Sequence, residues 1–316
     1  MKIIAKSEKE DLAVVYIGEF RNGRRIECVE SLQPPFSRRK KWVLIISVMY
    51  GCPVQCRFCD AGYYYRGPVS KDDMLEQIDY LVSTRYPDKQ VETDKFKIQF
   101  ARMGEPALNT AVLDVLEELP HRYRVPGLMP TVSTIAPRSC KDFFTRLLDI
   151  KKTLYSERFQ LQFSLHTTDP ERRSWLIPVR TLSFAEIAAY GKRFYQGQGR
   201  KITLNFALDN QSELDPGVLL NYFSPETYLI KITPVNPTYS ARDNNLRTSE
   251  RITGTCEHIR AHGYDVILSI GEMEENKIGS NCGQYIQKKL TQQTQLQDSY
   301  TYQLQELREE EHRFSC

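Results

Sequence analysis

The stretch that decides the fold runs from Trp42 to Cys59 and reads WVLIISVMYGCPVQCRFC. Its first half, up to Met49, is a nearly continuous apolar run, which is typical of a β-strand buried on both faces of a parallel sheet. Its second half places Cys52, Cys56 and Cys59 within eight positions, directly after that strand. The sequence therefore predicts a buried strand that delivers a cysteine-rich loop to one edge of a sheet.

Strand and helix patterns alternate along the chain from residue 42 to about residue 270. After the first strand, more strands are predicted at Phe96–Phe100, Met129–Thr134, Phe159–Leu165, Ile202–Leu208, Tyr228–Thr233 and Asp265–Ile270. Helical spacing of apolar residues predicts helices at Lys71–Tyr86, Thr110–Leu119, Lys141–Leu154, Phe184–Tyr195, Pro216–Phe223 and Arg251–His262. Such alternation builds βαβ units, so the predicted fold class is α/β with a parallel sheet.

Two segments fall outside this alternation, so three parts of the chain are expected. Residues 1–41 are interpreted as a small N-terminal β extension, a hairpin with strands Ala13–Tyr16 and Arg25–Val29 around the turn at Arg21-Asn22-Gly23. Residues 42–289 hold the βα series. Residues 290–316 are polar and rich in glutamine, and we expect a polar C-terminal helix there.

The composition is that of an ordinary globular protein. The chain has 316 residues, and its 43 Lys and Arg against 40 Asp and Glu leave a net charge of only +3, so no broad basic field for nonspecific nucleic-acid binding is implied. The short basic run at residues 37–41 is interpreted as a solvated loop. No apolar run approaches the roughly 18 residues of a membrane helix, and the N-terminus lacks signal-peptide features, so we expect a cytoplasmic protein with reduced thiols.

The three clustered cysteines point to a metal centre with an open position. In a reducing compartment such a cluster is more often metal-binding or catalytic than disulfide-forming. A structural zinc site normally has four ligands, and so does a closed iron–sulfur cluster. Three cysteines would leave one iron of a cluster free to bind a substrate or cofactor. Zinc binding and plain burial of three core cysteines are the alternatives.

The spacing Cys-x3-Cys-x2-Cys, with Phe58 before the third cysteine, resembles the radical S-adenosylmethionine (radical SAM) superfamily. In that superfamily the free iron binds the amino and carboxylate groups of S-adenosylmethionine (SAM), which is then cleaved to methionine and a 5′-deoxyadenosyl radical. The resemblance implies a full or partial (β/α) barrel with its site at the carboxyl ends of the strands. Together with the βα series it predicts a partial (β/α)6-type TIM barrel.

Further motifs narrow the resemblance to one family. Each follows a predicted strand or stands near the end of the series: Met103-Gly104-Glu105-Pro106, Val132-Ser133-Thr134, Ser164-Leu165-His166, Pro234-Val235-Asn236-Pro237 and Asn281-Cys282-Gly283-Gln284. In this order they resemble the RlmN/Cfr-type adenine methyltransferases, which act on ribosomal RNA. The likeness spans residues 43 to about 287.

The resemblance assigns roles to individual residues. It implies a [4Fe–4S] cluster on Cys52, Cys56 and Cys59, SAM as the second cofactor, and an external electron donor such as flavodoxin or ferredoxin. The residues expected to contact the cofactors are Phe58, Gly104, Glu105, Ser133, Ser164, His166 and Asn236. In the family, the cysteine matching Cys282 is methylated by one SAM, loses hydrogen to a second SAM-derived radical, and adds to adenine.

The family's second catalytic cysteine is missing. It should lie seven residues before Cys52, where this chain has Ile45, and isoleucine can neither take a proton nor attack a sulfur. Cys140, expected at the start of a helix at the catalytic end of the sheet, is the best substitute, because a helix N-terminus lowers the pKa of a thiol. The alternative is a structural cysteine.

Other departures concern the substrate. The family has an N-terminal helical RNA-binding domain, whereas only about 41 residues precede the predicted barrel. Acidic Glu274-Glu275 stands where the family has a basic Arg-Gly, and Tyr63-Tyr64-Tyr65 where it has glutamine and glycine. Aromatic rings there could stack on a base, line a pocket or simply pack over the site. These departures leave RNA as one of several candidate substrates.

Three functions are consistent with these residues. The first is methyl or methylene transfer through Cys282 on an altered substrate. The second is a radical SAM enzyme that abstracts hydrogen directly from a small molecule or peptide. The third is an iron–sulfur protein that carries electrons or binds a partner, against which the intact set of SAM-binding motifs argues.

Overall fold

The computed structural model describes residues 1–316 except 270–272, 281–284, 287–301 and 308–316. The described residues form one mixed 11-stranded sheet in the order β10-β9-β8-β7-β6-β5-β4-β3-β2-β1-β11. Strands β1 to β10 lie side by side in their chain order, whereas β11 returns to the opposite edge and pairs with β1.

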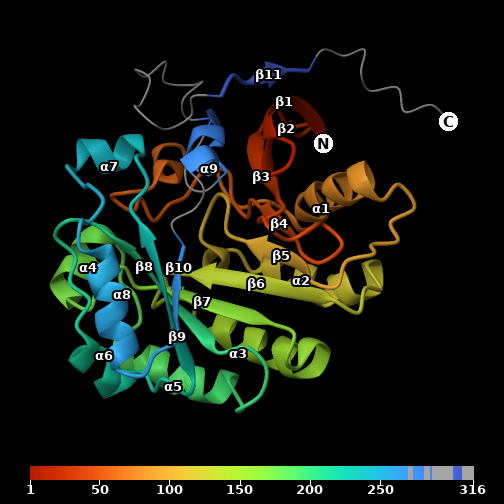
Figure 1. The fold of residues 1–316 in the computed structure, drawn as a ribbon. Helices are drawn as coiled ribbons and strands as arrows, with labels where there is room; N and C mark the ends of the chain where they lie inside the picture. The colour runs from red at the N-terminus through yellow and green to blue at the C-terminus, as the bar shows by residue number, and fades with distance from the viewer. Residues whose placement is uncertain (270–272, 281–284, 287–301, 308–316) are drawn as a thin grey trace.

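The parallel half of the sheet is the predicted partial barrel. Its strands are β4 (Trp42–Ile46), β5 (Phe96–Phe100), β6 (Leu128–Thr134), β7 (Gln160–Ser164), β8 (Ile202–Leu208), β9 (Tyr228–Pro234) and β10 (Val266–Leu268). The helices that cover the outer side of this curved sheet in Figure 1 are α1 (Lys71–Arg85), α2 (Ala111–Arg122), α3 (Lys141–Ile150), α5 (Phe184–Phe194), α6 (Pro216–Tyr222) and α8 (Ile252–Ala261). The described strands form an open sheet, since β10 lies at one edge and β4 pairs with β3 rather than with β10.

The N-terminal extension has three strands where a two-stranded hairpin was predicted. They are β1 (Lys2–Lys9), β2 (Ala13–Glu19) and β3 (Arg25–Ser31), all antiparallel, and β3 pairs with β4 so that the extension continues the barrel sheet. Strand β1 carries lysine and glutamate on its more exposed face, which hid it from a search for apolar runs. In the C-terminal segment, the described residues include β11 (Gln305–Glu306), which pairs with β1 and so differs from the predicted helix; residues 290–301 and 308–316 lie outside the described part.

Short helices in the loops were not predicted. They are α4 (Pro170–Leu176), α7 (Tyr239–Asp243), α9 (Met273–Ile278) and the 3-10 helices at Asp60–Tyr63 and Pro106–Leu108; the π-helical turn at Lys151–Tyr155 is not among them, because it continues α3 within the helix predicted at Lys141–Leu154. Each has too few residues to show a helical repeat of apolar positions. Two of them begin at recognisable N-caps, because the side chain of Asp169 accepts from the Glu171 N–H and that of Thr238 from the Ala241 N–H.

Strand alternation separates the core from the barrel interior. In β5, Phe96, Ile98 and Phe100 are fully buried. They alternate with Lys97 and Gln99, and Gln99 lines the cavity inside the barrel. The outer face of the sheet therefore packs on the helices, while its inner face presents polar side chains.

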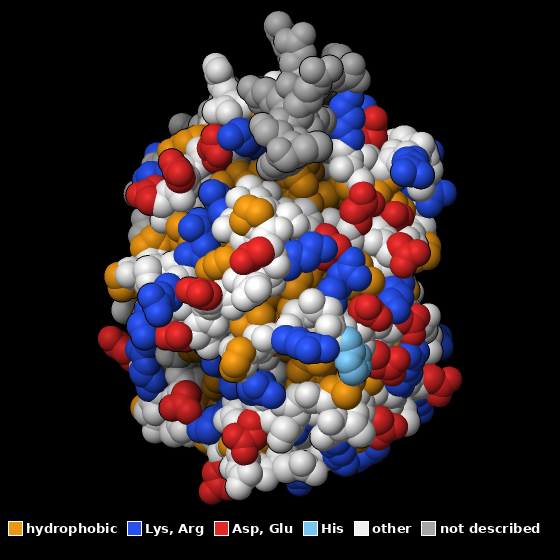
Figure 2. Space-filling model, turned by 90° about the vertical axis from the view of Figure 1, so that its right-hand side faces the viewer, with side chains coloured by type: hydrophobic (Ala, Val, Ile, Leu, Met, Phe, Trp, Pro, Cys, Tyr) orange, Lys and Arg blue, Asp and Glu red, His pale blue; other side chains and the backbone are white. Residues whose placement is uncertain are grey.

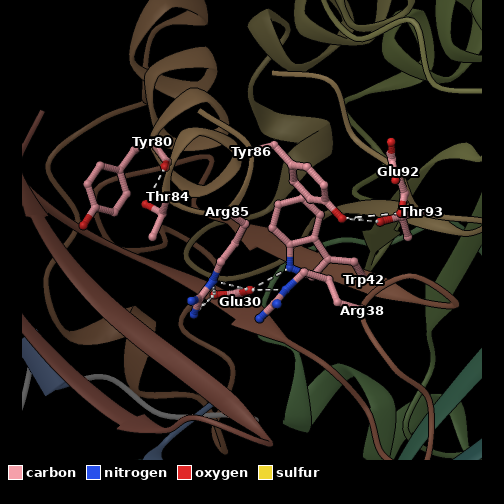
Figure 3. A network of polar contacts seen from close by, with 9 residues as sticks. All are labelled: Glu30, Arg38, Trp42, Tyr80, Thr84, Arg85, Tyr86, Glu92 and Thr93. Carbon is pink, nitrogen blue, oxygen red and sulfur yellow. Dashed lines mark hydrogen bonds and ion pairs between the residues drawn. The ribbon is translucent and has the colours of Figure 1, made fainter. Parts of the chain in front are cut away.

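A buried carboxylate ties the extension to the barrel (Figure 3). The side chain of Glu30, on β3, is 3% exposed and accepts from Arg85 Nε on α1 at 2.9 and 3.0 Å. It also accepts from Trp42 Nε1 on β4 at 2.9 Å and from Arg38 Nε at 3.1 Å. Charge-assisted bonds of this kind, away from water, hold β3, β4 and α1 in one unit.

The surface over α1 and α2 carries interspersed positive and negative side chains, as Figure 2 shows. This mixture fits the small net charge. In the part of the chain that the structure describes, no helix combines the length and apolar character needed to span a bilayer.

Candidate active site

The three clustered cysteines line one cavity of about 340 Å³ at the carboxyl ends of the parallel strands. The loop that bears them turns away from β4 at Gly51, whose φ of +81° brings its backbone against the carbonyl of Tyr64. Within the loop the Cys59 N–H donates to the carbonyl of Cys56 at 3.0 Å. The predicted metal ligands are therefore brought together at the mouth of the barrel.

The cysteine loop is anchored by the two short helices that the sequence did not reveal. The Arg57 N–H donates to the carbonyl of Leu176 at the end of α4. At the start of α7, the Thr238 hydroxyl donates to the carbonyl of Phe58 at 2.9 Å and the Ser240 hydroxyl to that of Cys59 at 3.2 Å. These contacts span about 120 to 180 positions of sequence, so no local pattern could announce them.

Burial dominates the electrostatics of the cysteine loop. Burial raises the pKa of Cys52 to about 11, and burial together with the neighbouring Cys59 and Cys52 raises the pKa of Cys56 well above its usual value. Bound irons would offset this cost by stabilising the thiolates. Among the described residues no three His, Cys, Asp or Glu side chains converge as one metal ion would require. A [4Fe–4S] cluster binds each thiolate to a different iron, so its three cysteines need not converge on a single atom.

Glu105 offers a fixed carboxylate beside the cysteine loop. Its Oε1 accepts from the Ala107 N–H at 3.0 Å and from the Thr134 hydroxyl, and its Oε2 accepts from the Ile135 N–H at 3.0 Å. The side chain lines the cavity, burial raises its pKa to about 7, and its backbone N–H donates to the sulfur of Cys52. A carboxylate held this way can bind an amino group, which is the role the resemblance gives it.

The other predicted cofactor residues line the same cavity: Phe58, Gly104, Ser133, Ser164, His166 and Asn236. The hydroxyl of Ser133 is buried and has no hydrogen-bond partner among the residues that the structure describes, which suits a site that binds a polar ligand. His166 packs edge-on against Phe58, with ring centroids 4.6 Å apart, and its Nδ1 accepts from the Ala207 N–H at 3.1 Å. Burial and the charge of Arg173 lower the pKa of His166 to about 3, so the ring is neutral and carries its proton on Nε2.

A buried ion pair brings the C-terminal segment to this cavity. Arg102 Nη2 lies 2.6 Å from Glu27 Oε2, and both side chains are at most 2% exposed. Arg102 also donates to the carbonyls of Gly279 and Ser280, at 2.7 and 3.2 Å, while Glu27 Oε1 accepts from the Ile286 N–H at 2.8 Å. We call this pair the Glu27–Arg102 clamp, because it holds both ends of residues 279–286.

Cys282 falls inside the segment that the clamp holds. Residues 281–284 lie outside the described part of the chain. Ser280, two residues before Cys282, lines the cofactor cavity together with Arg102. Neither member of the clamp was singled out from the sequence; Arg102 directly precedes the Met103–Pro106 motif, which was the available signal.

The prediction of a lowered pKa for Cys140 is wrong. Cys140 does stand at the N-cap of α3, but burial and the nearby Glu105 raise its pKa, and its sulfur makes no capping hydrogen bond. It is also absent from the described lining of the cofactor cavity, whereas Ile45 is part of that lining. Cys28 and Cys256 are buried in the core, and Cys316 lies outside the described residues.

The tyrosine triplet, Tyr63 to Tyr65, is exposed beside the cysteine loop, with each side chain more than 40% exposed. Tyr64 lines a second cavity of about 430 Å³, and the guanidinium of Arg66 lies 4.1 Å from its ring centre. Of the acidic pair, Glu275 lines the cofactor cavity, and the side chain of Glu274 lies outside the described part.

Comparisons with known proteins give relatives but no matching family model. The chain is 29% identical over 278 residues to a "Probable dual-specificity RNA methyltransferase RlmN" of Desulfitobacterium hafniense, covering 83% of this chain and 72% of the relative. It is 24% identical over 307 residues to a "Dual-specificity RNA methyltransferase RlmN" of Aliarcobacter butzleri, covering 89% and 82%. Among solved structures, a radical SAM methyltransferase from Sphaerobacter thermophilus superposes with a TM-score of 0.69 at 22% identity, covering 84% of this chain and 76% of that one.

These relatives confirm the resemblance to the RlmN/Cfr-type methyltransferases that the motifs predicted. Both relatives are named as RNA methyltransferases, which is the kind of enzyme that the motifs resemble. The superposition independently confirms the partial-barrel fold.

Proposed function

We propose that this chain is a radical SAM enzyme that transfers a methyl or methylene group through Cys282, in the manner of the RlmN/Cfr-type enzymes but on an altered substrate. When bound by Cys52, Cys56 and Cys59, the cluster and its SAM supply a carbon radical strong enough to remove hydrogen from an unreactive C–H bond. An external electron donor such as flavodoxin or ferredoxin would reduce the cluster. The remaining chemistry belongs to residues of the chain.

The observation that carries the proposal is the convergence of the clamped segment on the cofactor cavity. The three cysteines, Glu105 and Ser280 line the same space. Arg102 and Glu27 hold the two ends of the segment that contains Cys282. The described residues on either side of positions 281–284 are therefore held at this cavity, which supports a role for Cys282 as the methyl acceptor.

The first step is a methyl transfer to the Cys282 sulfur. Bound SAM would supply the methyl group: its S–CH3 bond would break as the bond to the Cys282 sulfur forms, the thiol proton would pass to solvent, and S-adenosylhomocysteine would leave. Glu105 would hold the amino group of SAM, and neutral His166 would add no charge that repels the sulfonium. The methylated thioether is the group from which hydrogen is then taken.

A second candidate is direct hydrogen abstraction from the substrate, and the cavity lining favours it in one respect. Among the described residues that line the cavity, the only thiols are Cys52, Cys56 and Cys59, and Ile45 occupies the place of the family's second cysteine. A covalent adduct between Cys282 and substrate would need another group for its release. Direct abstraction needs no release step.

The mass of Cys282 decides between the two candidates. The anaerobically reconstituted enzyme is incubated with SAM bearing a trideuterated methyl group, and the peptide that contains Cys282 is measured. We expect a labelled methyl group on Cys282, no label in Cys282→Ala, and unchanged labelling in the control Cys256→Ala, whose cysteine is buried in the core. Cleavage of SAM to 5′-deoxyadenosine without any label on Cys282 would select direct abstraction.

Cys140→Ala tests the expectation from the sequence that Cys140 replaces the family's second catalytic cysteine. A variant that still methylates Cys282 but accumulates a protein–substrate adduct would assign the release step to Cys140. Turnover at the wild-type rate would show that Cys140 is not required for the release step.

A further inference from the structure

The second cavity, of about 430 Å³, adjoins the cofactor cavity, and Ala61 lines both. Part of its lining is the turn between β2 and β3, which carries Arg24. Another part is the segment after the cysteine loop, which carries Tyr64 and Arg66. We call this space the arginine cavity. Its volume is typical of a small-molecule site, and a ligand in it would border the place where the cofactors bind.

Main-chain hydrogen bonds fix the segment that carries Tyr64 and Arg66. The Arg66 N–H donates to the carbonyl of Tyr50 at 2.6 Å, and the Tyr50 N–H donates to the carbonyl of Gly67 at 3.0 Å. Tyr50 is buried, and its hydroxyl donates to the carboxylate of Asp73 on α1 at 3.0 Å. The backbone around the cavity is therefore ordered before a ligand arrives, which lowers the entropic cost of binding.

Two arginines of the cavity are held against aromatic rings. The guanidinium of Arg24 lies 5.2 Å from the ring centre of Tyr50, and that of Arg66 lies 4.1 Å from the ring centre of Tyr64. A Cβ added to Gly67 would lie 3.7 Å from Arg24 Nη1, so this guanidinium reaches the residue next to Arg66. Within the described part of the chain, neither arginine forms an ion pair. A single unpaired arginine is ordinary at a surface, but two that converge on one cavity leave their donors available to a shared anion.

The other charged side chains of the described lining have partners of their own. Arg25 Nε lies 2.8 Å from Glu19 Oε2. Asp60 is 2% exposed, and its carboxylate accepts from the backbone N–H groups of Tyr239 and Ser240 at 3.2 and 2.9 Å. The cavity therefore keeps the positive charge of its two unpaired arginines.

We propose that the arginine cavity binds a small phosphorylated molecule with a flat aromatic part, such as a nucleoside monophosphate, and that this molecule is the substrate. The inference rests on the proposed function, because it takes the adjoining cofactor cavity to be the place of reaction. Arg24 and Arg66 bind the phosphate, since guanidinium groups match its oxygens with paired hydrogen bonds. Tyr64 stacks on the aromatic part, because its side chain lines the cavity and is 43% exposed.

A small ligand fits this cavity better than a nucleic-acid strand does. Strand-binding surfaces neutralise a row of phosphates. The whole chain has a net charge of only +3, and the two unpaired arginines of the cavity suit one phosphate group. Ile286, whose N–H donates to Glu27 of the clamp, also lines the cavity. A bound molecule would therefore contact one end of the clamped segment.

Binding can be measured without turnover. The cluster-reconstituted protein is titrated calorimetrically with each of the four ribonucleoside 5′-monophosphates, and at least one should bind saturably. Arg24→Gln and Arg66→Gln should each weaken this binding about tenfold or more, since each loses a charge-assisted contact. The matched control Arg21→Gln removes the same charge from the same turn, but from a side chain outside the described lining, and should bind within about twofold of wild type. The nucleoside without its phosphate should bind about tenfold more weakly than the nucleotide.

The tyrosine triplet supplies a second matched pair. Tyr64→Leu should weaken binding about tenfold, because it loses the stacking ring. Tyr65→Leu changes a side chain outside the described lining and should bind within about twofold of wild type. The two side chains are 43% and 45% exposed, so both variants should keep the fold.

Three results would overturn the proposal. They are the absence of saturable binding for every mononucleotide, equal binding by wild type, Arg24→Gln and Arg66→Gln, and tighter binding of a short single-stranded RNA without a terminal phosphate than of any mononucleotide. Cys282→Ala should still bind the mononucleotide. An unlabelled Cys282 in the mass measurement would therefore refute the proposed transfer chemistry and leave this binding result unaffected.

Discussion

Replacing Arg102 by methionine should destabilise the protein far more than replacing a surface arginine. The Arg102 guanidinium lies 2.6 Å from the Glu27 carboxylate, and the two side chains are 2% and 0% exposed. Removing one partner leaves a buried carboxylate without its counter-charge, which costs about 3–5 kcal/mol of unfolding free energy in comparable pairs. Methionine fills similar volume, so a cavity adds little to this cost.

A double variant checks the loss of unfolding free energy expected for Arg102→Met. Glu27→Gln combined with Arg102→Met removes both charges, so the double variant should be more stable than Arg102→Met alone. The deficit of Arg102→Met should also shrink as the pH falls. Burial already raises the pKa of Glu27, and loss of Arg102 raises it further, so the unpaired charge is present only above that pKa and disappears on protonation.

The assay is urea unfolding, with Arg146→Met as the matched control. Arg146 pairs with Asp114 and Glu117 at 2.7 Å, but its side chain is 42% exposed, so its loss should cost at most about 1 kcal/mol. Hydrogen exchange provides a local readout, because the Ile286 N–H donates to Glu27 and should lose protection in Arg102→Met. If Arg102→Met lost no more stability than Arg146→Met, and the Ile286 amide kept its protection, the clamp would have no anchoring role.

Three further perturbations follow from the geometry. Glu30→Gln should lower the unfolding free energy by about 1–3 kcal/mol in urea, because its carboxylate bonds two arginines and an indole at 3% exposure; an unchanged midpoint would contradict this. His166→Gln should flatten the dependence of unfolding free energy on pH. The pKa of His166 is about 3 in the folded state and about 6.5 in the unfolded state, so the wild type loses about 2 kcal/mol between pH 7.5 and 5 as the unfolded ring takes up a proton. Equal slopes for both proteins would contradict the buried neutral ring. Gly104→Ala should weaken SAM binding about tenfold or more, measured by titration calorimetry. Gly104 has a φ of +98°, and an added Cβ would lie 2.5 Å from Met49 Cβ. The control Gly254→Ala has open space around the added Cβ and should bind SAM normally.

The sequence alone determined the βα series and the residues that meet at the cofactor cavity. Buried strands such as Trp42–Ile46 appear as apolar runs, and helices longer than ten residues show their repeat, because both signals are local and periodic. The side chains that follow the strands, including Glu105 and Ser133, converge because the carboxyl ends of parallel strands share one edge. Relatives confirmed the family resemblance that these motifs predicted.

Only the tertiary structure showed which contacts hold the residues of the cofactor cavity in place. The Glu27–Arg102 clamp joins a strand of the extension, the loop after β5 and the C-terminal segment. Helix α7 holds the cysteine loop across 180 positions of sequence. Contacts at such separations have no local period. They form because a buried charged or polar group is stable only with a hydrogen-bond or ion-pair partner, and that partner lies on whichever element packs beside it in the folded chain.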